Sequence, residues 1–305
     1  SHPVWCWIFE DAAVTPVELA LGLIACVAAV WLGAALAKKQ ARTFSASSAR
    51  SAEGVASDNG GLPLVNFFDY GDMRFLHLGS PAVQGSMKIS KPFEIHLDYV
   101  QRMMAGLLLT DLDHVHRLQA MQLGLGAAAL TKFCHTPLGM HTTAIELNPQ
   151  VIATCRQSFH LPPNSDRLQV GVNDAAAAVR DEQWHGKIDV LQVDLYDQDA
   201  ARPAVDTEDF YSDCRHLLTS NGCMTVNLFG HDANYADSLQ KIKTVFGANA
   251  IWAFKPTAAG NSIVMAFRTP RVFDPDALMT QAQAIEARWS LPATKWLKVL
   301  APVKH

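Results

Sequence analysis

The sequence lacks the cysteine and histidine patterns that would indicate a metal site or a disulfide framework. Its six cysteines are dispersed without a CxxC pair, and its twelve histidines include no HExxH motif. In a chain of 305 residues this pattern predicts reduced, packed thiols, and we expect no metal ion. A GxSxG nucleophile elbow and a Ser-His-Asp order are also missing, which disfavours hydrolase chemistry.

Charge is also scarce. Charged residues make up 18% of the chain and the net charge is −4, with an isoelectric point near 6.3. Lysine and arginine are scattered, and KKQAR at 38–42 is their only small cluster. Binding of nucleic acid would require a basic face, so we expect no nucleic-acid partner.

Long apolar runs are limited to residues 19–37, which are uncharged and just long enough to cross a bilayer. Asp11 and Glu18 precede this run, and Lys38 and Lys39 follow it, so its insertion would leave the rest of the chain in the cytoplasm. Two other interpretations stay open: an alanine-rich helix packed on the domain, or sequence upstream of the functional protein. We expect residues 1–61 to combine this segment with a flexible linker, in a cytoplasmic protein that is either free or anchored to the inner face of the membrane.

The remaining chain divides into two predicted parts. Residues 62–110 alternate short apolar stretches with turns and end in a helical spacing over 93–109, which predicts a small β-rich N-terminal domain. Over 111–305 strands and helices alternate, which predicts a mostly parallel, Rossmann-like sheet covered by helices on both faces. We expect strands at 119–123, 142–146, 167–172, 188–193, 222–228, 250–254 and 262–267, and helices at 127–134, 149–158, 174–182, 207–218, 235–245 and 275–289. The last two strands are too close for a crossover helix and should pair antiparallel.

The most informative motif is a glycine turn followed by an acid. Gly124 and Gly126 stand between a predicted strand and a helix of small residues, where the chain must turn sharply. Glu146 follows at the carboxyl end of the next strand, where a carboxylate can accept both hydroxyl hydrogens of a ribose. Strand, turn, helix, strand and acid in this order indicate a nucleoside-bearing cofactor.

Further acids follow the next two strands. Asp174 heads a run of alanines, where it either caps a helix or also accepts from an adenine amino group. Asp194 ends an apolar strand, where a carboxylate is costly unless it meets a cation or hydrogen-bond donors. Together with Asp197 it would suit a cationic amine, with one carboxylate accepting a proton and the other holding an ammonium group. A merely acidic, solvated loop is the alternative.

In order and spacing, the residues resemble the spermidine synthase-like aminopropyltransferases from about Arg74 to Arg268. The similarity covers Gln84 and the stretches YVQRMM, LGLGAAALTKF, AIELNPQVI, NDA, DVLQVDLYD, FYSDCRHLLTSNG and TVNLF. The resemblance implies an N-terminal β-domain before a methyltransferase-type sheet with an antiparallel last strand. It also implies aminopropyl transfer from decarboxylated S-adenosylmethionine to a diamine such as putrescine. We further expect a homodimer.

The same resemblance implies a role for each candidate residue. Gly124 and Gly126 would line the cofactor, Glu146 would bind its ribose and Asp174 its adenine. Asp194 would be the catalytic base. The amine substrate would be held by Asp197, Gln84 and Tyr99.

Three departures from the family pattern concern the amine-binding acids. The usual GGGDGG turn is GLGAAA here, with Ala127 in place of the acid that grips the aminopropyl arm. The family's Tyr-His/Gln-Glu triplet is Tyr99-Val100-Gln101, and its Asp-Ser-x-Asp-Pro loop is DLYDQ at 194–198. Two other functions therefore stay open: an S-adenosylmethionine-dependent methyltransferase, and a non-catalytic relative with the same fold.

Overall fold

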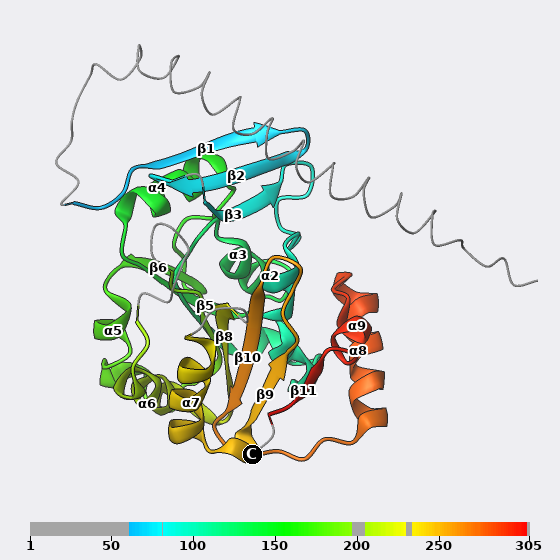
Figure 1. The fold of residues 1–305 in the computed structure, drawn as a ribbon. Coiled ribbons are helices and arrows are strands. Elements are labelled where there is room, and N and C mark those ends of the chain that lie inside the picture. The colour runs from blue at the N-terminus through cyan, green and yellow to red at the C-terminus, as the bar shows by residue number, and fades with distance from the viewer. Residues whose placement is uncertain (1–60, 81, 197–204, 230–233, 304–305) are drawn as a thin grey trace, which may run out of the picture. The chain divides into compact units, whose positions relative to one another are not determined.

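The computed structural model describes residues 61–80, 82–196, 205–229 and 234–303 (Figure 1). The apolar run 19–37, the linker and Asp197 lie outside these residues. Residues Asn59–His305 make up one compact unit, and the division expected at residue 110 stays a prediction. No helix in the described part of the chain is long and apolar enough to span a membrane.

A large sheet of eight strands forms the centre of this unit, in the order β11-β9-β10-β8-β7-β4-β5-β6. Its strands β4 to β8 pair parallel, while β10 pairs antiparallel with both β8 and β9, as the short connection predicted. The strands are β4 (Gln119–Leu123), β5 (His141–Glu146), β6 (Leu168–Val172), β7 (Ile188–Val193), β8 (Leu218–Phe229), β9 (Ile251–Phe254), β10 (Asn261–Phe267) and β11 (Leu300–Pro302). The expected α/β architecture is confirmed.

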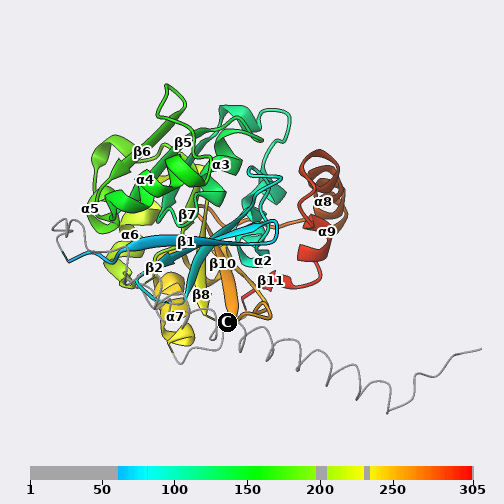
Figure 2. The same cartoon turned by 90° about the horizontal axis from the view of Figure 1, so that it is seen from above.

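A second, antiparallel sheet contains β1 (Val65–Tyr70), β2 (Met73–Leu78) and β3 (Val83–Lys88). Figures 1 and 2 show it above one end of the large sheet, beside α3 and α4. Contacts of β3 with α3 and of β1 with α4 hold it there. It therefore lies over the carboxyl ends of the central strands, where ligands bind in parallel α/β sheets.

Helices connect the strands of the large sheet. They are α2 (Asp98–Arg102), α3 (Ala129–His135), α4 (Pro149–Ser158), α5 (Ala175–Ala178), α6 (Glu208–Leu217), α7 (Tyr235–Phe246), α8 (Pro275–Trp289) and α9 (Ala293–Trp296), with 3₁₀ turns η1 (Ala105–Leu109), η2 (Val115–Arg117), η3 (Glu182–Trp184) and η4 (Ala248–Ala250). Asn148 caps α4 by accepting from the Gln150 N–H, and Thr207 caps α6 in the same way. The four cysteines of the described residues are buried and free, as expected.

The structure corrects several element boundaries. The helical spacing over 93–109 is α2 followed by η1, because the Met103 carbonyl at the break accepts hydrogen bonds from Gln192 and Thr225 of the sheet. The helix expected at 174–182 ends at Ala178, and Asp181 then caps the short turn η3. Neither β11 nor α9 was predicted, because each is too short to show a periodic pattern.

Candidate active site

The glycine turn lies directly between the ends of three parallel strands. The Gly124 N–H donates to the Ile145 carbonyl of β5, and the Asp194 N–H beyond β7 donates to the Leu123 carbonyl of β4, both at 2.9 Å. Gly124 has φ +88°, and a Cβ there would lie 2.3 Å from the backbone oxygen of Asp194. Because only glycine tolerates both the angle and this approach, the turn fixes the β7 end against the β4 end.

Glu146 holds the same turn from the opposite side. Its Oε2 accepts the Leu125 N–H at 3.0 Å, and its Oε1 accepts the Asn148 N–H at 2.9 Å. Burial raises the pKa of this carboxyl group, and the backbone donors offset part of the rise. A carboxylate has about four lone-pair positions, and the backbone donors do not use all of them, so Glu146 could still accept from a ribose hydroxyl. The donor and acceptor set at this point therefore fits a nucleoside.

On the other side of the turn, Asp194 faces Tyr99 of α2. The Tyr99 hydroxyl lies 3.4 Å from Asp194 Oδ2, and the Asn227 amide of β8 donates to Asp194 Oδ1 at 2.9 Å. Burial raises the pKa of the half-buried Asp194, while these two donors lower it in part. Burial, followed by the nearby Asp194 charge, also raises the pKa of Tyr99 well above its ordinary value. Asp194 is thus a desolvated carboxylate with an increased affinity for a proton, which suits a general base.

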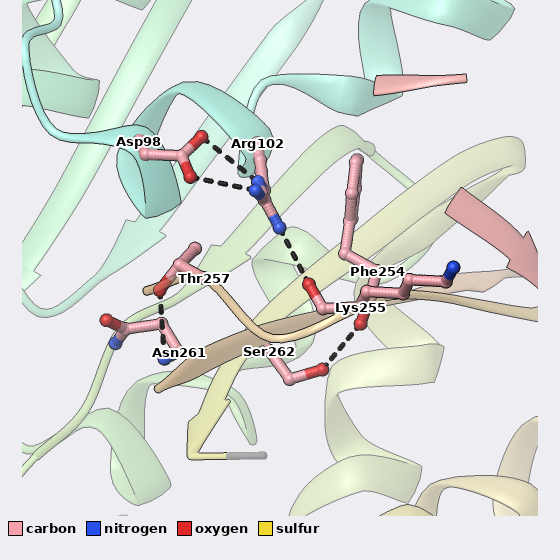
Figure 3. Close-up of polar contacts among 7 residues, drawn as sticks. All are labelled: Asp98, Arg102, Phe254, Lys255, Thr257, Asn261 and Ser262. Carbon is pink, nitrogen blue, oxygen red and sulfur yellow. Dashed lines mark hydrogen bonds and ion pairs between the residues drawn. The ribbon is translucent and has the colours of Figure 1, made fainter. Parts of the chain in front are cut away.

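Asn227 is itself oriented by the β9–β10 hairpin. Its side-chain oxygen accepts from the Asn261 amide at 3.0 Å, which leaves its NH₂ group pointing to Asp194. The Asn261 N–H in turn donates to Thr257 Oγ1 at 3.1 Å, a contact drawn in Figure 3. The carboxylate is therefore at the end of a chain of hydrogen bonds that crosses three strands.

The same hairpin also holds the helix that carries Tyr99. Figure 3 shows Arg102 of α2 between Asp98, with which it forms an ion pair at 2.8 Å, and the Lys255 carbonyl, to which it donates at 2.7 Å. The guanidinium group also lies over the Phe254 ring, 5.4 Å from its centroid. Tyr99 and Asp194 are thus positioned through one shared element, the β9–β10 hairpin.

Gly124, Tyr99 and Asp194 line a pocket of about 390 Å³, a volume that includes open solvent at its mouth. Its walls come from the glycine turn, from the segment Ile95–Val100 and from β3 of the small sheet, and Asp194 is its carboxylate. Most of the lining is apolar, and its polar side chains are those of Gln84, Ser86, His96, Tyr99 and Asp194. A pocket of this kind fits a small molecule with an aliphatic part and a few polar groups.

The predicted site residues fall into two groups in the structure. Gly124, Gly126, Gln84, Tyr99 and Asp194 line the pocket together. Glu146 does not line it but contacts the same turn through its hydrogen bond to Leu125.

Asp174 is the outlying predicted site residue. It is exposed and caps α5 through the Ala177 N–H at 2.9 Å, so the capping interpretation is observed and adenine binding stays a prediction. Asp197 lies outside the described residues.

Sequence reasoning missed several polar residues of this region, among them His96 in the pocket lining and two residues on strands. Ser86 lines the pocket from β3, and Asn261 orients Asn227 from the first residue of β10. No local pattern distinguishes either from an ordinary strand residue. Their positions depend on pairing between strands far apart in the sequence, which only the fold reveals.

The fold and the site together define a Rossmann-like protein of the methyltransferase type, with a glycine turn at the strand ends and an acidic group beside it. Comparisons with known proteins agree with this description of the fold. The chain matches the family described as "Spermine/spermidine synthase domain" over residues 112–275. It is 34% identical to the polyamine aminopropyltransferase of Chromobacterium violaceum over 232 residues, covering 75% of this chain and 86% of that protein. It is 32% identical to the polyamine aminopropyltransferase of Neisseria meningitidis, covering 76% of this chain and 86% of that protein. The chain belongs to the spermine/spermidine synthase family.

Solved structures support the fold. A crystal structure described as a probable spermidine synthase from Corynebacterium glutamicum superposes with a TM-score of 0.59 at 18% identity, covering 74% of this chain and 83% of that one. Human methyltransferase-like protein 13, in complex with SAH, gives a TM-score of 0.58 at 22% identity, covering 64% of this chain and 93% of that one. At these identities the similarity concerns the fold.

Proposed function

We propose that this protein transfers an aminopropyl group from decarboxylated S-adenosylmethionine to a small amine, with a diamine such as putrescine as the acceptor. The observation that carries the proposal is the Tyr99–Asp194 pair, which faces a largely apolar pocket beside the glycine turn. Membership of a family whose relatives are named polyamine aminopropyltransferases supports it.

The residues around the glycine turn would hold the donor. Gly124 and Gly126 line the pocket at this turn, and Glu146 has acceptor capacity for ribose hydroxyls. Asp174, at the neighbouring strand end, is our candidate for the adenine amino group. When bound, the donor supplies a carbon activated by an adjacent sulfonium for attack by an amine.

The other side of the pocket would prepare the acceptor. Asp194 Oδ2 and the Tyr99 hydroxyl face each other, so an amine nitrogen beside them would find one strong proton acceptor and one neutral partner. As the new N–C bond forms, the bond between the donor's activated carbon and the sulfonium would break and methylthioadenosine would leave as a neutral thioether. Asp194 would take the proton that the nitrogen loses as it becomes a secondary amine. The apolar walls would hold the aliphatic chain and exclude water, while Gln84 and Asp197 are our candidates for the distal contacts.

One observation favours methyl transfer as a second candidate. Ala127 stands where the family carries the acid that grips the donor's aminopropyl arm, and its Cβ faces the backbone of β3. Titration calorimetry with decarboxylated and intact S-adenosylmethionine separates the two functions. Tighter binding of the decarboxylated donor supports aminopropyl transfer, whereas a preference for the intact form supports the methyltransferase.

Asp194→Asn tests the assigned base. The amide keeps the shape and can accept one of the two hydrogen bonds through its oxygen, but it cannot take a proton at neutral pH. We expect turnover to fall about 10²- to 10⁴-fold, the usual contribution of a general base, while the affinity for the donor changes little by calorimetry.

Asp189→Asn is the matched control, because Asp189 stands on the same strand β7 at its other end and contacts Gln119 and Thr219. It should retain activity. Normal turnover in Asp194→Asn would refute the role of Asp194.

A further inference from the structure

Ser86 has a hydroxyl group that the fold buries and leaves without a hydrogen bond. The residue is 5% exposed, and its Oγ has no partner among the described residues. Burying a hydroxyl without a partner costs free energy, and an alanine would avoid this cost. Five side chains of the described residues have a buried polar atom without a partner, and among these five Ser86 alone lines the pocket.

The surroundings of Ser86 prevent it from finding a partner by a small shift of β3. A Cβ on the adjacent Gly85 would lie 2.7 Å from the Ala127 nitrogen and 2.8 Å from the Ala127 Cβ. The backbone of β3 therefore lies directly on the glycine turn, and its pairing with β2 aligns Ser86 with Phe75. Gln84, which lies where the pairing of β2 with β3 is irregular, is the other polar residue that this strand contributes to the pocket.

The charge distribution in the pocket indicates what this hydroxyl could bind. Asp194 is the only carboxylate among the described lining residues, and it lies with Tyr99 on the side formed by α2 and β7. The β3 wall offers neutral polar groups, and aliphatic side chains such as Ile95 and Leu97 lie among the remaining lining residues. An acceptor whose reacting nitrogen is at Asp194 would thus extend past apolar walls toward neutral hydrogen-bonding groups.

We propose that Ser86 binds the distal polar group of the acceptor, and that the acceptor is a short aliphatic amine with a second N–H or O–H group. The proposal rests on the function proposed above and adds a specificity residue to it. A hydroxyl both donates and accepts, so Ser86 would serve an amino alcohol as well as a diamine. A simple alkylamine has no group to offer it.

Three acceptors test the inference: 1,4-diaminobutane, 4-amino-1-butanol and butylamine, each assayed with wild type, Ser86→Ala and Ser86→Thr. Loss of one hydrogen bond corresponds to about a 5- to 10-fold loss of affinity. Ser86→Ala should therefore raise KM by about that factor for the two bifunctional acceptors, leave kcat within about twofold, and leave butylamine unaffected. Ser86→Thr keeps the hydroxyl and should restore most of the loss. Ser90→Ala, which removes an exposed hydroxyl bonded to Asp72, is the control.

The melting temperature gives an independent readout. Without ligand, Ser86→Ala should melt at the same temperature as wild type or higher, because it removes an unsatisfied group. A lower melting temperature of Ser86→Ala would overturn the proposal. So would a KM that changes equally for all three acceptors, or a KM that changes for none of them. If wild type transfers no aminopropyl group to any of the three acceptors, the proposed function fails. Calorimetric titration with 1,4-diaminobutane then tests separately whether Ser86 binds the acceptor. Weaker binding by Ser86→Ala than by wild type would then support its role, and equal or absent binding would refute it.

Discussion

Replacing Asn227 by leucine should increase the proton affinity of Asp194, the proposed base. The Asn227 amide donates to Asp194 Oδ1 at 2.9 Å, whereas the other side-chain donor, the Tyr99 hydroxyl, is at 3.4 Å. Leucine has a similar size but no donor, so the charged form of Asp194 loses its shorter hydrogen bond. The protonated form is then favoured, and the pKa of Asp194, already raised by burial, should rise further.

The size of the shift follows from the strength of the lost bond. A hydrogen bond to a charged group contributes about 1.5–3 kcal/mol, and one pKa unit corresponds to about 1.4 kcal/mol. The acidic limb of the kcat/KM profile should therefore move upward by about 1 to 2 pH units. Activity should be largely recovered at alkaline pH, where Asp194 is again ionised.

The assay measures kcat/KM for aminopropyl transfer between about pH 5 and 10, a range that brackets the expected shift. The acceptor amine also titrates, but its contribution is the same for wild type and variant and cancels in the comparison. Asn221→Ala, an exposed asparagine on the same strand, should leave the profile unchanged. Asn261→Ala should give a smaller shift in the same direction, because Asn227 then loses the contact that orients it. A variant that loses activity equally at every pH would refute the reasoning.

Two further predictions concern buried or half-buried cations. Arg102→Lys should lower kcat with little change in the affinity for the donor. An ammonium group has a single nitrogen, so it cannot replace the guanidinium group, which contacts Asp98 with two nitrogens and the Lys255 carbonyl with a third. An unchanged kcat would show that the position of Tyr99 does not depend on this contact. Lys132 is 1% exposed, donates to the Phe159 carbonyl, and burial lowers its pKa to about 8. Between pH 8 and the ordinary value of 10.5 the unfolded chain binds more protons at this residue, so its contribution to stability rises with pH by up to about 1.4 kcal/mol per unit. Denaturant titrations should therefore show the stability of wild type relative to Lys132→Met increasing over this range, and a constant difference would contradict the assigned pKa.

Much of the large sheet could be predicted from sequence, because its signals are local. The strands around Gly124 are short apolar runs, and the glycines and acids that end them mark the turns. Helices α4 and α8 were predicted with their observed bounds, since each begins with a capping residue followed by proline. The antiparallel pairing of β10 followed from the short connection before it.

The candidate site could be predicted only in part, for a physical reason. A strand-end acid such as Asp194 is visible in the sequence because a carboxylate after an apolar run is costly. The residues that tune it are less visible: Asn227 is a neutral polar residue on an apolar strand, and Asn261 is separated from it by 34 positions. Their hydrogen bonds depend on the register in which β8 and β10 pair, which sequence patterns do not specify.

The close contact between β3 and the glycine turn depends on two small residues, Gly85 and Ala127. Ala127 is 3% exposed and lines the pocket. A Cβ on Gly85 would lie 2.7 Å from the Ala127 nitrogen and 2.8 Å from the Ala127 Cβ, so any side chain at position 85 would force β3 away from the turn. Glycine at position 85 therefore allows β3 to approach the turn. This approach fixes β3, and with it Gln84 and Ser86, as one wall of the pocket. The neutral polar character of that wall is thus a consequence of the packing between β3 and the turn, which no local sequence pattern specifies.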